Sequence, residues 1–174
     1  MAVRLFLWWF TVGTNDVATW ASHGQNVGAR GLAETYRTER LYNHPPLIGL
    51  FAAWAVEASG GLTLPFARLI KLPSMLGEAV ALAALWRWGG VRLAAIYALL
   101  PAPILVAAYH GNTDCLYAAF ALLAALAWER RRFALAGLAL AAALNVKLIP
   151  LVLLPLYVIG APSASALLRF GATL

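Results

Sequence analysis

Hydrophobic residues occur in seven runs along the chain, and the stretches between them are polar or contain Gly and Pro. Most of the runs are apolar on every face, a pattern typical of helices surrounded by protein or lipid. A helix needs about 20 apolar residues to cross a bilayer, and several runs approach that length. The pattern predicts apolar segments at residues 3–12, 46–58, 66–86, 91–109, 114–128, 133–147 and 148–160.

The longest polar stretch, residues 13–45, separates the first two runs. A connection of this length is more often functional than idle. Part of it, from Val27 to Arg40, has the spacing of a short amphipathic helix on a membrane surface. Its ionisable residues, unusually dense for this chain, are Asp16, His23, Arg30, Glu34, Arg37, Glu39, Arg40 and His44.

The composition places the chain in a membrane. Hydrophobic residues make up 63% of it and charged residues 11%, and the mean hydropathy is +0.77. Soluble domains have about 45–50% apolar and about 25% charged residues. The net charge is +6, but the basic residues are scattered rather than gathered in a stripe, which argues against a nucleic-acid partner. We therefore expect an all-α, polytopic transmembrane bundle.

Two basic turns indicate the orientation. Arg130 to Arg132 lie in one turn, and Arg87 and Arg92 lie in another. Both turns are expected in the cytoplasm by the positive-inside rule. One span separates each turn from residues 109–114, which are therefore expected outside.

The run at residues 46–58 is expected not to cross. It has only about 13 residues, a length typical of re-entrant or interfacial segments, and it begins at Pro45 and Pro46. Residues 13–65 then form one long external region with juxtamembrane helices. This topology gathers a set of polar residues at the outer face: Asp16, His44, Lys71, His110, Asp114 and Lys147.

The chain is expected to be a piece of a longer protein with a single transmembrane domain over residues 1–174. Residues 1–12 are too short for a complete span and read as the end of a first one. Residues 66–160 supply about five further membrane segments, and residues 161–174 begin the next loop.

Five motifs occur in order: GTNDVATW at 13–20, YNHPPLIGL at 42–50, IKLPSMLGEAVALAAL at 70–85, YHGNTDCLYAAFALLAAL at 109–126, and LNVKLIPLVLLPL at 144–156. Together they resemble the GT-C superfamily of membrane glycosyltransferases. The closest likeness is to the branches that use polyprenyl- or dolichyl-phosphate-linked mannose or glucose. The resemblance extends over nearly the whole chain.

The resemblance implies roles for individual residues. The family's catalytic carboxylate lies in the first external loop, just after the first transmembrane helix, and corresponds to Asp16. The family's YxxPPL-like element matches Tyr42 to Leu47, and its KxxP pattern matches Lys147 to Pro150. Glu78 stands where members often have Asp. Many members also have a second acidic residue beside the first, whereas Asp16 stands alone, so no metal ligand is assigned and a divalent metal requirement stays open.

The chemistry of such a transfer agrees with these residue types. A base must take the acceptor proton as the anomeric carbon is attacked, or a carboxylate must orient the acceptor, and Asp16 suits either role. The leaving polyprenyl phosphate needs fixed cations, for which Arg68, Lys71 and Lys147 are candidates. Residues able to hydrogen-bond sugar or phosphate are Asn15, His44, His110, Asn112 and Asp114.

The resemblance therefore implies a hexosyltransferase of cell-envelope glycan or glycolipid biosynthesis, located in the plasma (inner) membrane with its site facing outside. It would move mannose or glucose from a polyprenyl phosphate to an acceptor hydroxyl, with the lipid-linked sugar as co-substrate and no other cofactor assigned. Its partners are membrane lipids, the donor and a glycan or glycolipid acceptor. A piece of such an enzyme need not be active alone.

Each assignment has a structural alternative. Asp16 can simply solvate a helix end, and Asp114 can be a first-turn carboxylate favoured by the helix dipole. Lys71 and Lys147 can extend to the membrane interface without binding phosphate.

Two other classes of function also stay open. One is a secondary transporter or lipid-linked-sugar carrier, with Glu78 and Asp114 as coupling residues near the midplane. The other is a non-catalytic membrane scaffold. Transporters concentrate ionisable residues in mid-membrane, whereas here most lie in the first loop and at the ends of spans. This distribution favours the transferase.

Overall fold

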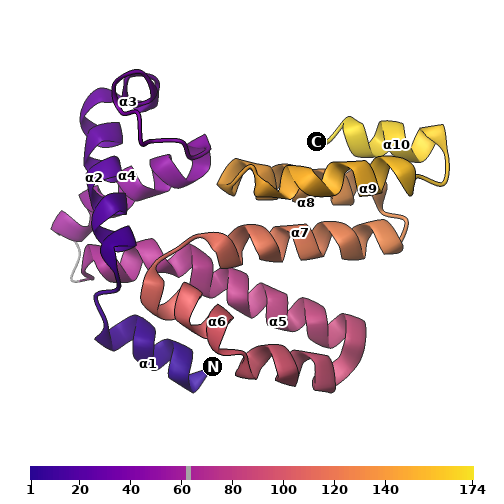
Figure 1. Ribbon diagram of the computed structural model, residues 1–174, viewed down its shortest axis with the longest axis horizontal. Helices are drawn as coiled ribbons and strands as arrows, with labels where there is room; N and C mark the ends of the chain where they lie inside the picture. The colour runs from indigo at the N-terminus through magenta and orange to yellow at the C-terminus, as the bar shows by residue number, and fades with distance from the viewer. Residues whose placement is uncertain (62–63) are drawn as a thin grey trace.

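The computed structural model describes residues 1–61 and 64–174, and these residues form helices joined by short connections, with no strand among them (Figure 1). The all-α prediction is confirmed for this part of the chain. The elements are α1 (Ala2–Phe10), α2 (Asn15–Arg30), α3 (Leu32–Thr38), α4 (Pro46–Gly61), α5 (Phe66–Leu99), α6 (Pro101–Ile104), the π-helix η1 (Leu105–His110), α7 (Asp114–Glu129), α8 (Phe133–Val146), the 3-10 helix η2 (Ile149–Leu153), α9 (Leu154–Ile159) and α10 (Ala164–Gly171).

Helix α5 reverses direction at Gly90, whose φ of 73° is readily adopted by glycine. A hydrogen bond shows the reversal, because Tyr97 Oη donates to Glu78 Oε1 at 2.5 Å. In a straight helix these two residues would lie roughly 28 Å apart along the axis. The two predicted runs at 66–86 and 91–109 are therefore antiparallel arms, as the end of α5 in Figure 1 shows.

One helix of the described residues, α5, is long and apolar enough to cross a membrane, with a mean hydropathy of 1.4 in its most apolar window. Its first arm, residues 66–89, still exceeds the roughly 20 residues that a span requires. The arm also approaches α7 closely, because a Cβ on Gly77 would lie 2.8 Å from the Cys115 carbonyl oxygen. Gly77 thus permits backbone contact between two apolar helices.

The second arm of the reversal is broken rather than continuous. The chain leaves helical geometry at Leu100, restarts at Pro101 as α6 and continues as η1 to His110. Proline lacks an amide hydrogen and clashes with the preceding turn, so Pro101 and Pro103 are tolerated only near a helix start. The predicted run at 91–109 is consequently three short pieces.

The polar stretch at residues 13–45 contains two helices. Helix α2 covers its first half, and α3 begins after Gly31, where φ is 79°. The expected helix from Val27 to Arg40 is thus divided at this glycine. Helix α4 has 16 residues and packs against α2. The stretch expected as the next loop, residues 161–174, contains α10, which packs against α8.

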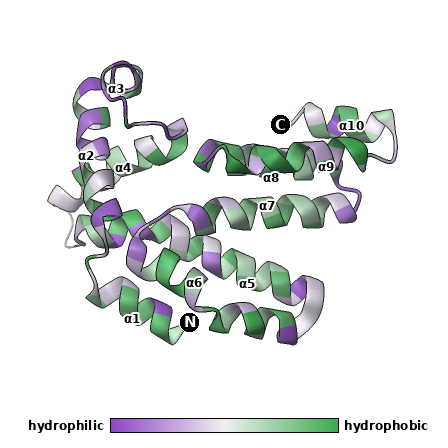
Figure 2. Ribbon diagram, in the orientation of Figure 1, coloured by the Kyte–Doolittle hydropathy of each residue, from purple (hydrophilic) through white to green (hydrophobic). Residues whose placement is uncertain are grey.

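The two ends of the molecule differ in character. The reversal of α5 at Gly90 and the α7–α8 connection lie at one end, and the connection from η1 to α7 lies at the other, beside α2 (Figure 1). Figure 2 shows hydrophobic residues along α5, α7 and α8 and many hydrophilic ones on α2 and α3. The basic turns and the polar stretch at residues 13–45 are therefore separated by the length of the bundle.

A buried cluster lies beneath the polar end. It joins α2, α4, α5 and α8 through Val17, Trp20, Ile48, Ala52, Ile70 and Val146. Val17 and Val146 immediately adjoin Asp16 and Lys147 in the sequence. Burial of the two valines thus anchors both charged residues to one core.

Candidate functional site

Asp16 lies in the first turn of α2, next to the connection between η1 and α7. Thr14 is the N-cap residue, and its hydroxyl accepts a bond from the Asp16 amide at 3.4 Å. The same hydroxyl donates to the His110 carbonyl at 3.0 Å. Thr14 therefore starts the helix and ties it to residues far along the chain.

This close approach depends on Gly111. Its φ is 82°, in the left-handed region, and a Cβ there would lie 2.6 Å from Val17 Cγ2. A side chain would be strained by the backbone conformation and would clash with α2. Glycine therefore lets His110 and Asn112 reach the start of α2.

The Asp16 carboxylate is partnered on one side only. His110 Nδ1 lies 3.1 Å from Asp16 Oδ2, and Asn112 Nδ2 donates to the same oxygen at 3.3 Å. The same His110 nitrogen lies 3.1 Å from Thr14 Oγ1, so the ring is placed between the threonine hydroxyl and the carboxylate. Oδ1 has no hydrogen-bond partner among the described residues and is available to another molecule.

Lys147 and Asp114 form a second charged pair nearby. Lys147 Nζ donates to Asp114 Oδ1 at 2.6 Å, and the Asp114 amide donates to Asn112 Oδ1 at 3.1 Å. Lys147 ends α8 and Asp114 begins α7, a position that the helix dipole favours for a carboxylate. Asn112 therefore links this pair to Asp16.

These residues surround a small polar pocket of about 100 Å³. Its lining residues come from α2, from the α3–α4 connection, from the η1–α7 connection and from the end of α8. They are Asp16, Thr19, Trp20, His44, Asn112 and Lys147. The pocket brings a carboxylate with a free oxygen together with an ammonium group. It is large enough for a few heavy atoms, such as a hydroxyl and its neighbours.

His44 is held in the pocket wall by aromatic neighbours. Its ring packs against Trp20 at a tilt of 46°, with 4.6 Å between centroids, and its carbonyl accepts from Tyr36 Oη at 2.5 Å. Burial lowers the pKa of His44, and the nearby His23 and Lys147 lower it further. At neutral pH the imidazole is therefore uncharged and can donate or accept a hydrogen bond.

Five candidate residues do not line the pocket. His110 and Asp114 contact residues that do, and the other three are Lys71, Arg68 and Asn15. Lys71 is fully buried, and its ammonium donates to the Thr11 carbonyl at 2.8 Å. Arg68 lies 4.0 Å over the Trp9 ring and donates to the Trp9 carbonyl. Asn15 is exposed at the start of α2.

Several residues of the site were not predicted from the sequence. Thr14, Thr19 and Trp20 were not among the candidates, although Trp20 lies one helical turn beyond Asp16 and shares its face. A Ser or Thr before an apolar-periodic segment is also a known N-cap signal.

A further missed contact joins α2 to the segment before His44. His23 Nδ1 lies 2.9 Å from Glu39 Oε2, and Asn26 donates to the other Glu39 oxygen. Nothing in the spacing of these residues indicates the contact, because it depends on how residues 39–44 cross α2.

No group of three or more His, Cys, Asp or Glu residues in the described part of the chain is arranged to hold a metal ion. Nor does any family model, curated protein or solved structure match the chain, so its assignment depends on the site itself.

Proposed function

We propose that the protein is a membrane glycosyltransferase of the GT-C type, which transfers a hexose from a polyprenyl phosphate to an acceptor hydroxyl. The observation that carries the proposal is the Asp16 carboxylate, which lines a polar pocket together with Lys147 and whose Oδ1 has no partner in the part of the chain that the structure describes. The order of motifs that resembles this superfamily supports it.

Asp16 would act on the acceptor. Its Oδ2 is held by His110 and Asn112, so the carboxylate has a defined orientation. Its Oδ1 would take the proton of the attacking hydroxyl, or orient that hydroxyl by a charge-assisted hydrogen bond. His44, uncharged at neutral pH, would contact the sugar from the opposite wall.

Lys147 is the best placed of the three proposed phosphate-binding cations. It reaches the pocket, whereas the ammonium of Lys71 is satisfied by Thr11 and Arg68 is stacked on Trp9. A cation fixed beside the leaving phosphate stabilises the charge that develops on it. Asp114 would hold Lys147 in place.

The proposed location is the plasma (inner) membrane with the pocket outside. Large hydrophobic side chains are exposed over the bundle, among them Leu76, Val91, Leu99, Val152, Leu156 and Ile159. Exposed apolar surface of this extent suits contact with lipid rather than water. The basic turns, expected in the cytoplasm, lie at the end opposite the pocket (Figure 1).

The test compares Asp16→Asn with the wild type. The full-length protein is reconstituted in liposomes with polyprenyl-phosphate mannose or glucose and an acceptor glycolipid, and transferred sugar is measured. Loss of a general base should lower the rate by about 100-fold or more. Glu34→Gln is the matched control, since it removes an exposed carboxylate of α3 outside the pocket.

Undiminished transfer by Asp16→Asn would remove this residue from catalysis. A wild type that transfers nothing from either donor, yet moves a lipid-linked sugar across the liposome membrane, would support the carrier instead. The described residues do not favour that alternative. Of its two proposed coupling residues, Glu78 is fully buried and bonded to Arg4 and Tyr97, and Asp114 is paired with Lys147.

A further inference from the structure

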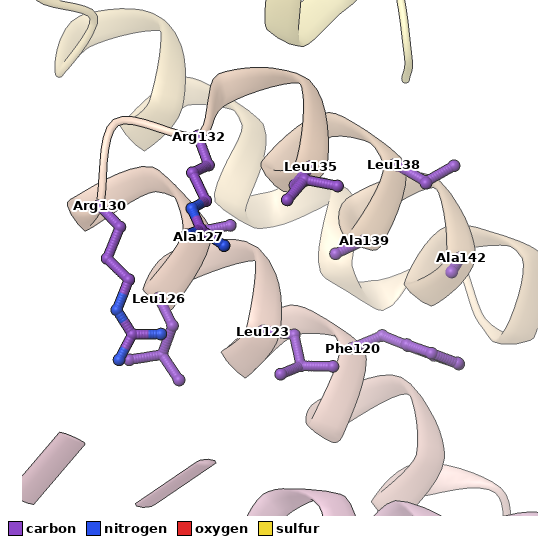
Figure 3. A pocket seen from close by; sticks show the side chains of 10 residues that line it. All are labelled: Phe120, Leu123, Leu126, Ala127, Arg130, Arg132, Leu135, Leu138, Ala139 and Ala142. Carbon is purple, nitrogen blue, oxygen red and sulfur yellow. The ribbon is translucent and has the colours of Figure 1, made fainter. Parts of the chain in front are cut away.

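An apolar groove of about 480 Å³ runs between α7 and α8, from the turn that joins them to Phe120 and Ala142. Figure 3 shows its lining, with leucine and alanine side chains from both helices and two arginines at one end. Arg130 and Arg132 are the only charged residues in this lining. Its volume is in the range of about 300–1,000 Å³ typical of ligand sites.

The two arginines are available to a ligand. Among the described residues, no salt bridge or side-chain hydrogen bond involves Arg130 or Arg132. In Figure 3 their side chains extend from the turn beside Leu126 and Ala127, at the mouth of the groove. Two guanidinium groups so placed suit a phosphate, which they can bind in bidentate fashion.

The length of the groove suits one leaflet of a bilayer. Along α7 it extends from Arg130 to Phe120, roughly 15 Å at the rise of an α-helix. This is about half of the 30 Å hydrocarbon core. A lipid whose phosphate meets the arginines would therefore lay an acyl chain along the groove and end near the midplane.

We propose that this groove binds an anionic glycerophospholipid of the inner leaflet, with its phosphate on Arg130 and Arg132 and one acyl chain between α7 and α8. Basic pockets between transmembrane helices on the cytoplasmic side are suited to such headgroups. The inference relies on the membrane location proposed above, but not on sugar transfer. Asp16→Asn should therefore bind the lipid as the wild type does.

The experiment titrates the full-length protein, in a neutral detergent, with phosphatidylglycerol or with phosphatidylcholine that has the same acyl chains. Native mass spectrometry measures the bound lipid. We expect phosphatidylglycerol to bind at least tenfold more tightly. The double variant Arg130→Gln/Arg132→Gln should weaken its binding about 30-fold and leave phosphatidylcholine unchanged.

A charge-matched double variant, Arg92→Gln/Arg131→Gln, separates the groove from general electrostatics. Both of its residues lie in the basic turns and outside the groove lining. This variant should retain at least a third of the wild-type affinity. Ala142→Phe, at the opposite end of the groove, should weaken the binding of both lipids by filling the space for the acyl chain. Thermal unfolding of this variant is measured to verify that it folds.

Three results would overturn the proposal. Equal binding of the two lipids by the wild type would show that the arginines do not select an anionic headgroup. Equal losses in the two double variants would remove the specific role of Arg130 and Arg132. Absence of any lipid binding would mean that another segment of the protein, or a second copy, occupies the groove.

Discussion

Glu78 in the middle of the bundle and Asp16 at its polar end are both carboxylates, and their surroundings differ. Glu78 is 0% exposed, and its oxygens accept from Arg4 Nε at 2.8 Å and from Tyr97 Oη. Asp16 is 38% exposed on its side chain, and its Oδ1 has no partner within residues 1–61 and 64–174. The first arrangement leaves no place for another molecule, and the second does.

The two carboxylates therefore suit different roles. Arg4 also donates to the Ala98 carbonyl at 2.8 Å, so this cluster joins α1 to both arms of α5. Its charges are neutralised inside the protein. The Asp16 carboxylate is partly accessible to solvent, so it can contact another molecule, whereas Glu78 can only stabilise the fold.

The largest effect is expected for Glu78→Gln. This change leaves the Arg4 charge buried without a counter-ion, which costs about 3–5 kcal/mol of the free energy of unfolding. Thermal or denaturant unfolding in detergent measures the loss. A change below about 1 kcal/mol would show that the ion pair is not a structural centre of the fold.

The double variant Arg4→Met/Glu78→Leu sharpens this result. Removing both charges removes the unpaired ion, so most of the stability lost in Glu78→Gln should return. A double variant that is no more stable than the single one would contradict the explanation by an unpaired charge.

Thr14→Ala should have a smaller effect, about 1 kcal/mol of the free energy of unfolding. It removes the N-cap of α2 and the bond to the His110 carbonyl. It should also slow sugar transfer, because the start of α2 would shift. Thr38→Ala is the control, since its hydroxyl bonds only within α3, and it should stay within about 0.5 kcal/mol of the wild type.

Asp16→Asn should change stability less still, by under about 1 kcal/mol, while it lowers the rate of transfer by about 100-fold or more. Its pair with His110 is partly exposed and therefore screened by solvent. Unfolding and activity are measured on the same preparation. A large loss of stability would make Asp16 a structural residue like Glu78 and break the comparison.

The smallest effect concerns pH and His44. Its pKa in the folded protein is lowered, chiefly by burial, so the unfolded chain takes up a proton at higher pH than the folded one. Stability should therefore fall as the pH drops below about 6.5, the pKa of an unperturbed histidine. In His44→Gln the loss of stability between pH 7.5 and 5.5 should be smaller, and equal losses in both proteins would contradict this account.

Much of the fold could be predicted from the sequence, because the hydrophobic runs and the positions of Gly and Pro are local signals. The predicted runs at 114–128 and 133–147 correspond to α7 and α8 within one residue. The break of the run at 91–109 into α6 and η1 was missed, although Pro101 and Pro103 indicate it.

The site was predictable only in part. The proximity of Asp16 to Asn112 and Asp114 follows from the topology that the charge pattern predicts. The different surroundings of Lys71 and Lys147 could not be predicted, because the two lysines have similar local sequences, each shortly before a proline. Lys71 is buried because Thr11, at the end of α1, covers it, and such a tertiary contact has no local signal.

The bond between Thr14 and His110 joins residues that lie 96 positions apart in the chain. At a synthesis rate of about 5–20 residues per second, His110 leaves the ribosome roughly 5–20 s after Thr14. Asp16 is therefore synthesised well before the residues that orient its carboxylate, and Lys147 is synthesised later still. The pocket can therefore be completed only after Lys147, the last of its lining residues along the chain, has been synthesised.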